Sequence, residues 1–379
     1  MPSVDVLISS PVVETFRVSQ VRGMFDLPPD SAVSQSWRFD FPIETEPWQI
    51  GLIVGPSGSG KSVVARHVFK SAYFHTGYKW PRNKSVVDGF PSHLSGEDVT
   101  AALSCVGFSS PPHWLKPFRH LSNGQQFRAE LARLMLENRP TVVCDEFTSV
   151  VDRDAAKISS AAISKALRKR ERPQFVALSC HYDVVEWLRP DWVLNMATRE
   201  FARVRLRRRP KIELRVRACN ATAWPVFRTH HYLSGRLAAQ STCFVATWNG
   251  TPVAFTSYLS QMHATVRNVK REHRTVVLPD FQGVGIGVAL SDWLGAYVAA
   301  RGWRFTSVTS HPAMIAHRMR SPNWVLRRRG RARPGGRLQT QNENAARMEA
   351  ARAVHSRGRI TASFTYVGKP LNTLAAFEL

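Results

Sequence analysis

Two glycine-rich turns constrain this chain more than any other feature of its sequence. Residues 55–62 read GPSGSGKS, and residues 282–287 read QGVGIG. Each turn follows an apolar run and precedes a stretch with helical spacing, which is the order strand, turn, helix. Glycines let backbone N–H groups point into such a turn, and the start of the helix adds its positive dipole end. The pattern predicts an α/β fold with two separate phosphate-binding sites.

The composition is that of a globular protein with an unusual charge. The chain has 379 residues, which suggests two or three domains, and its formal net charge is +24 at pH 7. So basic a balance favours a polyanionic partner, for which nucleic acid is the usual candidate. The five cysteines form no CxxC pair, which argues against a disulfide framework or a structural zinc site. We find neither a membrane-spanning run nor a secretory signal, and therefore expect a cytoplasmic protein with no membrane partner.

A change of pattern near residue 207 predicts two domains. Before it, apolar runs alternate with helical stretches, which indicates a largely parallel sheet; these runs are 48–55, 140–147 and 173–180. The segment 203–217 then carries eight Lys or Arg residues and one acid. We place the boundary inside it, giving domains 1–207 and 208–379. A second basic run, 327–337, contains Gly and Pro and is predicted to be an exposed loop.

The first glycine turn has the sequence and context of a Walker A P-loop. Its backbone N–H groups would hold the phosphates of ATP, and Lys61 would reach the β- and γ-phosphates. Ser62 would help to hold Mg²⁺. A chance Gly/Ser loop is the alternative, and it is rare in a chain of average composition. The predicted phosphate-binding loop consists of Gly55, Pro56, Ser57, Gly58, Ser59 and Gly60.

Two further patterns fit the same kind of site. TVVCDE (141–146) predicts a buried strand ending in two acids. Asp145 is placed to hold Mg²⁺, and Glu146 is placed to orient or deprotonate the attacking water. LSNGQQFRAELARLML (121–136) predicts a helix whose N-terminal end is another anion site. Each pattern alone is also typical of an ordinary strand end or a capped helix.

Taken in order, these motifs resemble those of the ABC-type ATPases over about 200 residues. LSNGQ resembles their LSGGQ signature, and CDEFTSVVD (144–152) resembles their Walker B and D-loop. LSCHYDVV (178–185) resembles the segment that carries the switch histidine, which would be His181. The resemblance implies a homodimer, in which the signature of one chain closes on the Lys61 loop of the other. The signature residues are Ser122, Asn123, Gly124 and Gln125.

The chain departs from that family at several positions. Asn123 replaces a glycine of the signature, and Phe147 replaces a proline. The Q-loop glutamine is not obvious, and Asp88 is a candidate substitute. Trp37 is the candidate for stacking on adenine. With one such domain and no membrane segment, the chain resembles the soluble ABC ATPases of nucleic-acid or translation processes more than a transporter.

The second glycine turn resembles motif A of the GNAT acyltransferases, written Q/R-x-x-G-x-G/A. The preceding LPDF resembles the family's V-x-P-x-(Y/F), and the resemblance covers roughly 210–370 as a mixed α+β domain. The order of elements upstream also fits the family, with a helix expected near 224–238. It implies that backbone N–H groups of the loop bind the pyrophosphate of acyl-CoA, with acetyl-CoA as the expected donor. The oxyanion donor is expected on the strand before the loop, at Val277 or Leu278. The matching loop residues are Gln282, Gly283, Gly285 and Gly287.

The sequence does not single out the general base or acid of the transferase. FRTHHYLSG (227–235) is the most site-like segment, and it loosely resembles the Mom-type DNA-modification proteins of phages. Histidine titrates near neutrality and suits a base, so His231 and Tyr232 are candidates together with His230. Packing or helix capping would explain these residues as well. Further candidates are Ser310, His311 and Tyr366.

The combined features predict an ATP-dependent acyltransferase that modifies a nucleic-acid base, in DNA rather than RNA. A base inside a duplex must be extruded before its amine can react, which gives an ATP-driven clamp a task. One alternative is a protein or small-molecule N-acetyltransferase that an ABC nucleotide switch regulates. The other is a DNA-binding ABC clamp whose GNAT domain is catalytically inactive.

Overall fold

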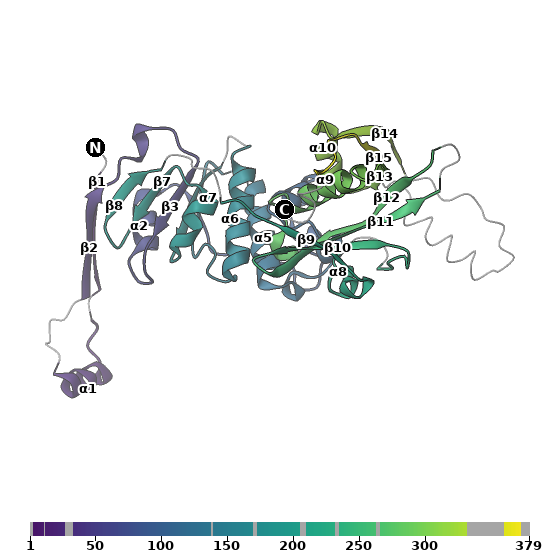
Figure 1. The fold of residues 1–379 in the computed structure, drawn as a ribbon. Helices are drawn as coiled ribbons and strands as arrows, with labels where there is room; N and C mark the ends of the chain where they lie inside the picture. The colour runs from purple at the N-terminus through teal and green to yellow at the C-terminus, as the bar shows by residue number, and fades with distance from the viewer. Residues whose placement is uncertain are drawn as a thin grey trace. The chain divides into compact units, whose positions relative to one another are not determined.

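The structure, a computed structural model, divides into two units (Figure 1). It describes residues 3–10, 12–26, 33–137, 139–169, 173–204, 210–231, 235–262, 266–331 and 360–372. The first unit is Met1–Lys79 with Leu134–Pro210, and the second is Trp80–Arg133 with Lys211–Leu379. The segment that carries the LSNGQ motif therefore packs with the C-terminal part of the chain. The domain division at residue 207 stays a prediction.

A mostly parallel sheet forms the centre of the first unit. Within the described residues its strands lie in the order β4-β5-β6-β3-β7-β8, and only β7 and β8 pair antiparallel. Every residue of β3 is buried, as expected for a central strand. The predicted strands at 48–55, 140–147 and 173–180 are confirmed as β3, β5 and β6. The strands are β3 (Ile50–Val54), β4 (Tyr73–His75), β5 (Thr141–Cys144), β6 (Gln174–Ser179), β7 (Trp192–Asn195) and β8 (Glu200–Arg203).

The helices of the first unit follow its strands. Each of the parallel strands β3 and β5 leads through a loop into a helix, which is the connection that parallel neighbours require. These helices are α2 (Lys61–Val68) and α6 (Arg153–Leu167), and a shorter helix, α7 (Val185–Leu188), follows β6 after the 3-10 turn η4 (Tyr182–Val184).

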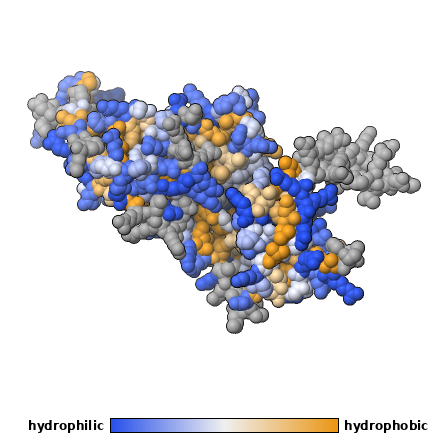
Figure 2. Space-filling model, turned by 90° about the horizontal axis from the view of Figure 1, so that it is seen from above, coloured by the Kyte–Doolittle hydropathy of each residue, from blue (hydrophilic) through white to orange (hydrophobic). Residues whose placement is uncertain are grey.

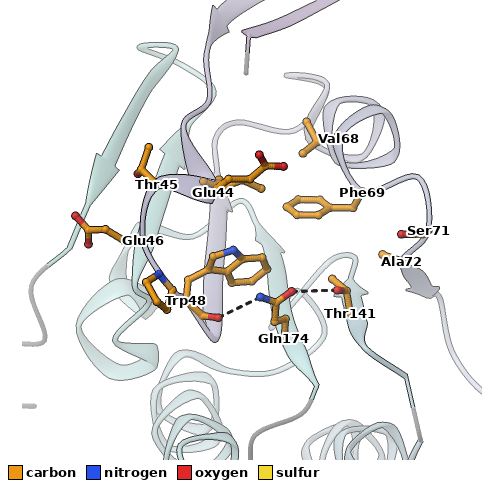
Figure 3. Close-up of a pocket in the computed structure, with 12 residues that line it drawn as sticks. Glu44, Thr45, Glu46, Trp48, Val68, Phe69, Ser71, Ala72, Thr141 and Gln174 are labelled. Atoms are coloured by element: carbon orange, nitrogen blue, oxygen red, sulfur yellow. Dashed lines mark hydrogen bonds between the residues drawn. The ribbon is translucent and has the colours of Figure 1, made fainter. Parts of the chain in front are cut away.

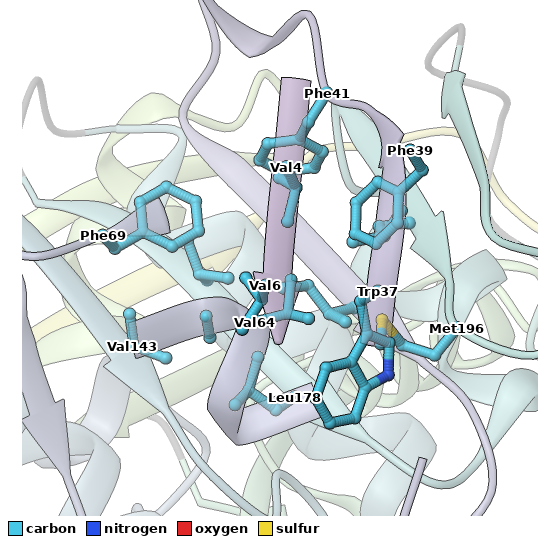
Figure 4. Packing of buried hydrophobic residues seen from close by; sticks show 14 of the residues in the cluster. Val4, Val6, Trp37, Phe39, Phe41, Val64, Phe69, Val143, Leu178 and Met196 are labelled. Carbon is cyan, nitrogen blue, oxygen red and sulfur yellow. The ribbon is translucent and has the colours of Figure 1, made fainter. Parts of the chain in front are cut away.

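A hairpin of β1 (Ser3–Ser10) and β2 (Val33–Asp40) completes the core of the first unit. Its inward side chains, among them Val4 and Trp37, pack with β3, α2 and β7 in one hydrophobic cluster (Figure 4). The helix α1 (Phe16–Phe25) lies between the two strands in sequence and has no buried residue. The 3-10 turn η1 (Ile43–Thr45) follows the hairpin.

The second unit begins with short helices around the LSNGQ motif. They are the 3-10 turns η2 (Val87–Gly89) and η3 (Phe118–His120) with the α-helices α3 (Gly96–Cys105), α4 (Pro111–Trp114) and α5 (Asn123–Leu136). Ser95 caps α3 with a capping box that it forms with Asp98. Helix α5 is continuous, although its last residues, from Leu134, belong to the first unit.

A mixed sheet follows, with the order β14-β15-β13-β12-β11-β10-β9 in the described residues. All pairs are antiparallel except β12–β13, which pair only at Val269–Arg304, Lys270–Phe305 and Arg271–Thr306. Beyond these pairs β12 and β13 are no longer paired, which leaves an opening in the sheet before the second glycine turn. The strands are β9 (Arg215–Cys219), β10 (Thr242–Trp248), β11 (Thr251–Gln261), β12 (Val269–Val277), β13 (Arg304–Thr309), β14 (Trp324–Arg331) and β15 (Ile360–Tyr366).

The mixed α+β expectation for this part is thus confirmed, with one difference in helix length. The helix expected near 224–238 is only α8 (Trp224–Arg228), preceded by the 3-10 turn η5 (Ala221–Ala223). A longer helix, α9 (Ile286–Ala299), follows the second glycine turn and the 3-10 turn η6 (Pro279–Phe281), and α10 (Pro312–Arg320) follows β13.

The second basic run is not a loop over its first five residues. Residues 327–331 belong to β14, an edge strand on which Arg328 and Arg329 are exposed. The opposite edge strand, β9, also exposes arginines, Arg215 and Arg217. Charged edges discourage strand pairing between molecules, which would explain these arginines without a ligand. Residues 332–337, like residues 205–209 of the first basic run, lie outside the described part.

Hydrophilic residues cover much of the face seen in Figure 2, and hydrophobic patches interrupt them. Within the described ranges, no helix has both the length and the apolar character needed to cross a membrane.

Candidate nucleotide and acyl-carrier sites

The first glycine turn is shaped to bind an anion. Gly58 and Gly60 adopt left-handed backbone angles, with φ of +75° and +87°, which glycine reaches without strain. Helix α2 begins at Lys61, and its first helical hydrogen bond is that of Val64 N–H to Gly60 O, 2.9 Å. The N–H groups of Lys61 and Ser62 precede that bond and have no partner within the helix. They are therefore placed for phosphate oxygens.

Lys61 lies folded over this turn. Its Nζ donates to the carbonyl oxygens of Gly55 and Pro56, at 2.9 and 2.8 Å. An ammonium group held this way remains inside the loop, where incoming phosphate oxygens would replace the two carbonyl acceptors. The geometry fits the role that the sequence assigns to Lys61.

Trp37 packs against the first glycine turn and is not available to stack on adenine. Its Nε1 donates to Ser59 O at 2.9 Å, and its ring lies where a Cβ of Gly60 would be. The side chain is buried in the hydrophobic cluster of Figure 4. The expectation that Trp37 stacks on adenine is therefore wrong for this conformation, because the side chain is only 7% exposed and packs in the core.

The two acids of the second motif follow β5, which lies on the far side of β6 from β3. Parallel strands place these acids and the first glycine turn at the same edge of the sheet. Glu146 has a left-handed φ of 50°, and its N–H donates to Asp145 Oδ1 at 2.9 Å. A non-glycine residue in this region stores about 1 kcal/mol or more of strain, which is often found at functional sites.

The chemistry of these side chains fits Mg²⁺ bound together with nucleotide. Mg²⁺ takes one or two protein oxygens and completes its shell with phosphate oxygens and water. Ser62 offers a hydroxyl and Asp145 a carboxylate. In the described ranges no group of three or more His, Cys, Asp or Glu side chains forms a metal cage of its own.

His181 follows β6 at the same edge of the sheet. Its N–H donates to Ser179 Oγ at 3.1 Å. Next to it, Asp183 forms an ion pair with Arg153, the first residue of α6. That pair joins the His181 segment to the helix after the two acids. Phe147, in the place of the family's proline, is fully buried against Phe175.

A separate pocket of about 540 Å³ lies at the other edge of this sheet. Its lining includes Trp48, which precedes β3, and Thr141 and Gln174, the first residues of β5 and β6 (Figure 3). Gln174 bridges the other two, through Trp48 O at 3.3 Å and Thr141 Oγ1 at 3.2 Å. Because the glycine turn follows the opposite end of β3, this pocket is not the expected nucleotide site.

The LSNGQ motif forms the start of α5. Ser122 and Gln125 cap it reciprocally: Ser122 N–H donates to Gln125 Oε1 at 3.3 Å, and Gln125 N–H to Ser122 Oγ at 3.4 Å. Gln125 is buried, whereas Ser122 and Asn123 are exposed. The motif thus presents its first two polar residues at a helix N-terminus.

The second glycine turn has the same anion-binding form as the first. Gly283 and Gly285 have φ of +92° and +107°. The first helical bond of α9 is Ala289 N–H to Gly285 O, 3.0 Å, so the N–H groups of Ile286 and Gly287 lack partners in the helix. A Cβ on Gly287 would meet Val277 at 3.2 Å, which keeps the helix close to β12.

Two details of this turn differ from the sequence expectation. Leu278 N–H donates to Val253 O at 2.9 Å, so it points toward β11 and is not the free oxyanion donor. Since backbone groups alternate along a strand, the N–H of Val277 points instead toward the opening beside β13. The Gln282 side chain is also engaged: its Nε2 donates to Val277 O at 2.8 Å, and its Oε1 accepts from Ser109 N–H at 2.7 Å. The backbone N–H of Gln282 donates to Pro279 O at 3.3 Å, so neither this N–H nor the side chain is free for an acyl carrier.

The LSNGQ segment contacts this turn inside the second unit. Arg128 of α5 is fully buried and donates to Pro279 O at 2.8 Å and to Asp280 O at 3.0 Å. Its guanidinium also lies 3.3 Å from the Asp280 carboxylate. Nothing in the local sequence pattern indicated Arg128, Ser109 or Asp280, because these contacts join residues more than 150 positions apart.

Three histidines lie among the residues that contact this turn or its partners. His230 follows α8 and stacks on His113 of α4, with ring centres 5.4 Å apart. Burial lowers the pKa of His230, which Asp280 partly raises again, and burial lowers the pKa of His113 to about 4. Burial lowers the pKa of His311 as well, and its ring bonds to the backbone of Ser109. All three are therefore neutral near pH 7.

The structure does not bring the other described candidates for catalysis, His231 and Tyr366, together at the turn. His231 is buried and packs edge-on against Trp224, which is a packing role. Tyr366 donates to Lys369 O at 3.2 Å and packs on Gly295, which is about 15 Å along α9 from Gly285. It is thus not at the turn. Tyr232 lies outside the described residues.

Two candidates remain, Asp88 and Ser310. Asp88 accepts a hydrogen bond from Ser85 Oγ at 2.5 Å, within η2 of the second unit. Ser310 follows β13, directly before His311. Neither arrangement assigns a catalytic role.

Comparison with known proteins identifies both halves. The acetyltransferase (GNAT) family model matches residues 217–319. Over 134 residues, 28% of this chain and 64% of the relative, the chain is 33% identical to the cytochrome c biogenesis ATP-binding export protein CcmA of Bartonella henselae. Over another 134-residue alignment, 30% of this chain and 49% of the relative, it is 29% identical to the zinc import ATP-binding protein ZnuC of Pseudomonas aeruginosa. The chain thus spans less than two thirds of either relative.

Solved structures of both kinds are also similar. A dimeric bacterial ABC transporter cassette matches with 13% identity and a TM-score of 0.36, covering 53% of this chain and 99% of that one. The ribosomal-protein-S18-alanine N-acetyltransferase from Escherichia coli matches with 16% identity and a TM-score of 0.30, covering 42% and 97%. By its family match and its curated relatives, this chain joins an ABC-type ATPase domain to a GNAT-family acetyltransferase domain.

Proposed function

We propose that this protein is an ATP-dependent N-acyltransferase that modifies the amine of a nucleic-acid base. The observation that carries the proposal is the contact of the LSNGQ helix with the acyl-carrier turn, through buried Arg128. An ATPase motif and a transferase motif that share one packed unit are suited to act together. A fusion of two independent enzymes has no need of such a contact.

The transfer step follows from the groups around the opening between β12 and β13. The acyl carrier would supply a thioester, held by the N–H groups of Ile286 and Gly287. The acceptor nitrogen would form a bond to the carbonyl carbon, and the carbonyl oxygen would take up negative charge beside Val277 N–H. His230, neutral through burial, would accept the proton of the amine. The carbon–sulfur bond would then break, and the thiolate would leave with a proton from solvent.

The acceptor is assigned from charge. The formal net charge is +24, and exposed arginines lie on the edge strands of the transferase sheet, at Arg328 and Arg329 on β14. A polyanion would gain from these charges, whereas a small-molecule amine would not. DNA is favoured over RNA because base extrusion from a duplex gives ATP binding a function.

ATP would act through a homodimer. The exposed Ser122 and Asn123 of one chain would close on the Lys61 loop of the other, with Mg²⁺ at Ser62 and Asp145. Glu146 would deprotonate the attacking water, and His181 would contact the γ-phosphate. Hydrolysis would then release the clamp. We place this protein in the cytoplasm, where its nucleic-acid substrate and acetyl-CoA are available.

The proposal is tested by analysing nucleosides from bacteria that express the protein. DNA and RNA would be digested and compared by mass with those from cells expressing Lys61→Ala or Gly285→Glu. We expect a nucleoside heavier by one acyl group, absent with either variant. Unmodified DNA and RNA, combined with acyl transfer to peptides or small amines by the purified protein, would contradict the nucleic-acid assignment.

A further inference from the structure

Arg128 is a charged residue buried within α5. Its side chain has no exposed area, and its guanidinium donates to two carbonyl oxygens of one short turn, η6. A buried guanidinium is stable only when its donors find partners, so this contact fixes the turn strongly. The turn leads directly into Gln282 and the acyl-carrier glycines.

A second contact holds the same turn from the α3–α4 connection. Ser109 N–H donates to Gln282 Oε1 at 2.7 Å. Gly107 lies so close that a Cβ there would be 2.5 Å from Gln282 O. The turn is thus held on two sides by the segment that carries the LSNGQ motif.

The acyl-carrier turn also reaches the start of α5. A Cβ on Gly124 would lie 2.9 Å from Asp280 Oδ1, so this carboxylate lies beside the glycine of the LSNGQ motif. The N-terminus of α5 attracts negative charge, and Asp280 supplies it. Nucleotide phosphate bound at Ser122 and Gly124 would meet this carboxylate at the same helix end, where two negative charges repel.

We propose that Arg128 and Asp280 are positioning residues of the transferase, which link the conformation of the acyl-carrier turn to nucleotide bound at the LSNGQ motif. This inference rests on the proposed function and extends it to regulation. Arg128 holds η6 in the form that binds the acyl carrier, and Asp280 senses phosphate at the start of α5. Linkage is reciprocal, so acyl carrier must change nucleotide affinity by the same factor by which nucleotide changes acyl-carrier affinity.

The test compares Arg128→Lys and Asp280→Asn with Arg119→Ala, a matched control at an exposed arginine of the same segment. Acetyl-CoA affinity is measured by calorimetry, with and without ATP, in the Glu146→Gln background. Lysine keeps the charge but lacks the rigid planar fork whose two nitrogens reach Pro279 O and Asp280 O separately, so we expect Arg128→Lys to weaken acetyl-CoA binding about tenfold. In Asp280→Asn the acetyl-CoA affinity should lose most of its dependence on ATP. Arg119→Ala should match the parent in both.

Hydrogen exchange of residues 279–290 in the ligand-free protein gives a readout that needs no acyl carrier. Arg128→Lys should exchange faster there than Arg119→Ala. If the parent binds no acetyl-CoA but this difference is present, the proposed function fails while the positioning role stands. Unchanged exchange together with unchanged acetyl-CoA affinity in Arg128→Lys would overturn the inference. An ATP dependence that survives intact in Asp280→Asn would overturn the role of Asp280.

Discussion

Two independent features restrict position 60 to glycine. Its φ is +87°, and a Cβ would lie 2.2 Å from the Trp37 ring, which is itself held by Ser59 O. Gly58 has a similar φ of +75° but has nothing within 4 Å of such a Cβ. We expect Gly58→Ala to lose about 1–2 kcal/mol through backbone strain alone. Gly60→Ala should lose more stability and also abolish ATP binding.

Melting temperature and ATP affinity of the two variants check this prediction. Replacing Trp37 by Leu in the Gly60→Ala background should restore part of the lost ATP affinity, because the clash is relieved. Equal losses in Gly58→Ala and Gly60→Ala would show that the Trp37 ring does not restrict the turn.

His113 predicts how stability depends on pH. Burial lowers its pKa from 6.5 to about 4, so the unfolded chain binds a proton between these values while the folded chain does not. The free energy of unfolding should therefore fall as pH drops from 6.5 to 4, by about 1–2 kcal/mol after allowance for solvent screening. His113→Gln should flatten this slope, whereas His120→Gln, at an exposed histidine, should not. Chemical unfolding at several pH values measures it, and parallel slopes in all three proteins would contradict it.

At the scale of the element, the edge strand β14 is the predicted nucleic-acid contact. It lies two strands from the opening beside β13, about 10 Å away, and its basic run continues beyond the strand. Each phosphate contact contributes about 0.9 to the slope of log affinity against log salt. Removing two arginines, as Arg328→Gln/Arg329→Gln, should reduce this slope by about 1.8. DNA binding measured at several salt concentrations gives the slopes.

The opposite edge supplies the control, because Arg215→Gln/Arg217→Gln makes the same change of charge on β9. A smaller effect there would identify β14 as the contact. The same decrease in both variants would indicate that total charge, and not the position of β14, determines binding.

The elements that the sequence predicted are those with a local cause. Glycine at left-handed positions specified both turns, and unbroken apolar runs specified β3, β5 and β6. The helix at 224–238 was overestimated because it was expected from the family's order of elements, which does not fix where a helix ends; α8 ends at Arg228. The choice of Leu278 was wrong because the direction of an N–H depends on strand register, which the sequence of one strand does not reveal.

The local sequence could not predict that Trp80–Arg133 packs with the C-terminal part of the chain. It depends on contacts such as Arg128–Pro279 between positions 151 apart, to which no periodicity corresponds. The family resemblance suggested the opposite grouping, because it treats the ATPase motifs as one domain. Tertiary packing alone decides where a motif-bearing helix lies.

For the whole molecule, a composite site makes a prediction that no single-chain site makes. If ATP is hydrolysed between the Lys61 loop of one chain and Ser122 of another, the Lys61→Ala and Ser122→Arg variants should each be inactive alone. Mixed in equal amounts, half of the dimers contain both variants, and each of these has one intact site. Independent sites would then restore about one quarter of the wild-type ATPase rate. A mixture of Lys61→Ala with Ser62→Ala, which alter the same loop, should restore none.

Sedimentation of the Glu146→Gln protein should show an ATP-dependent dimer. A monomer at all ATP concentrations, or no recovery in the first mixture despite dimer formation, would place the LSNGQ motif outside the ATP site.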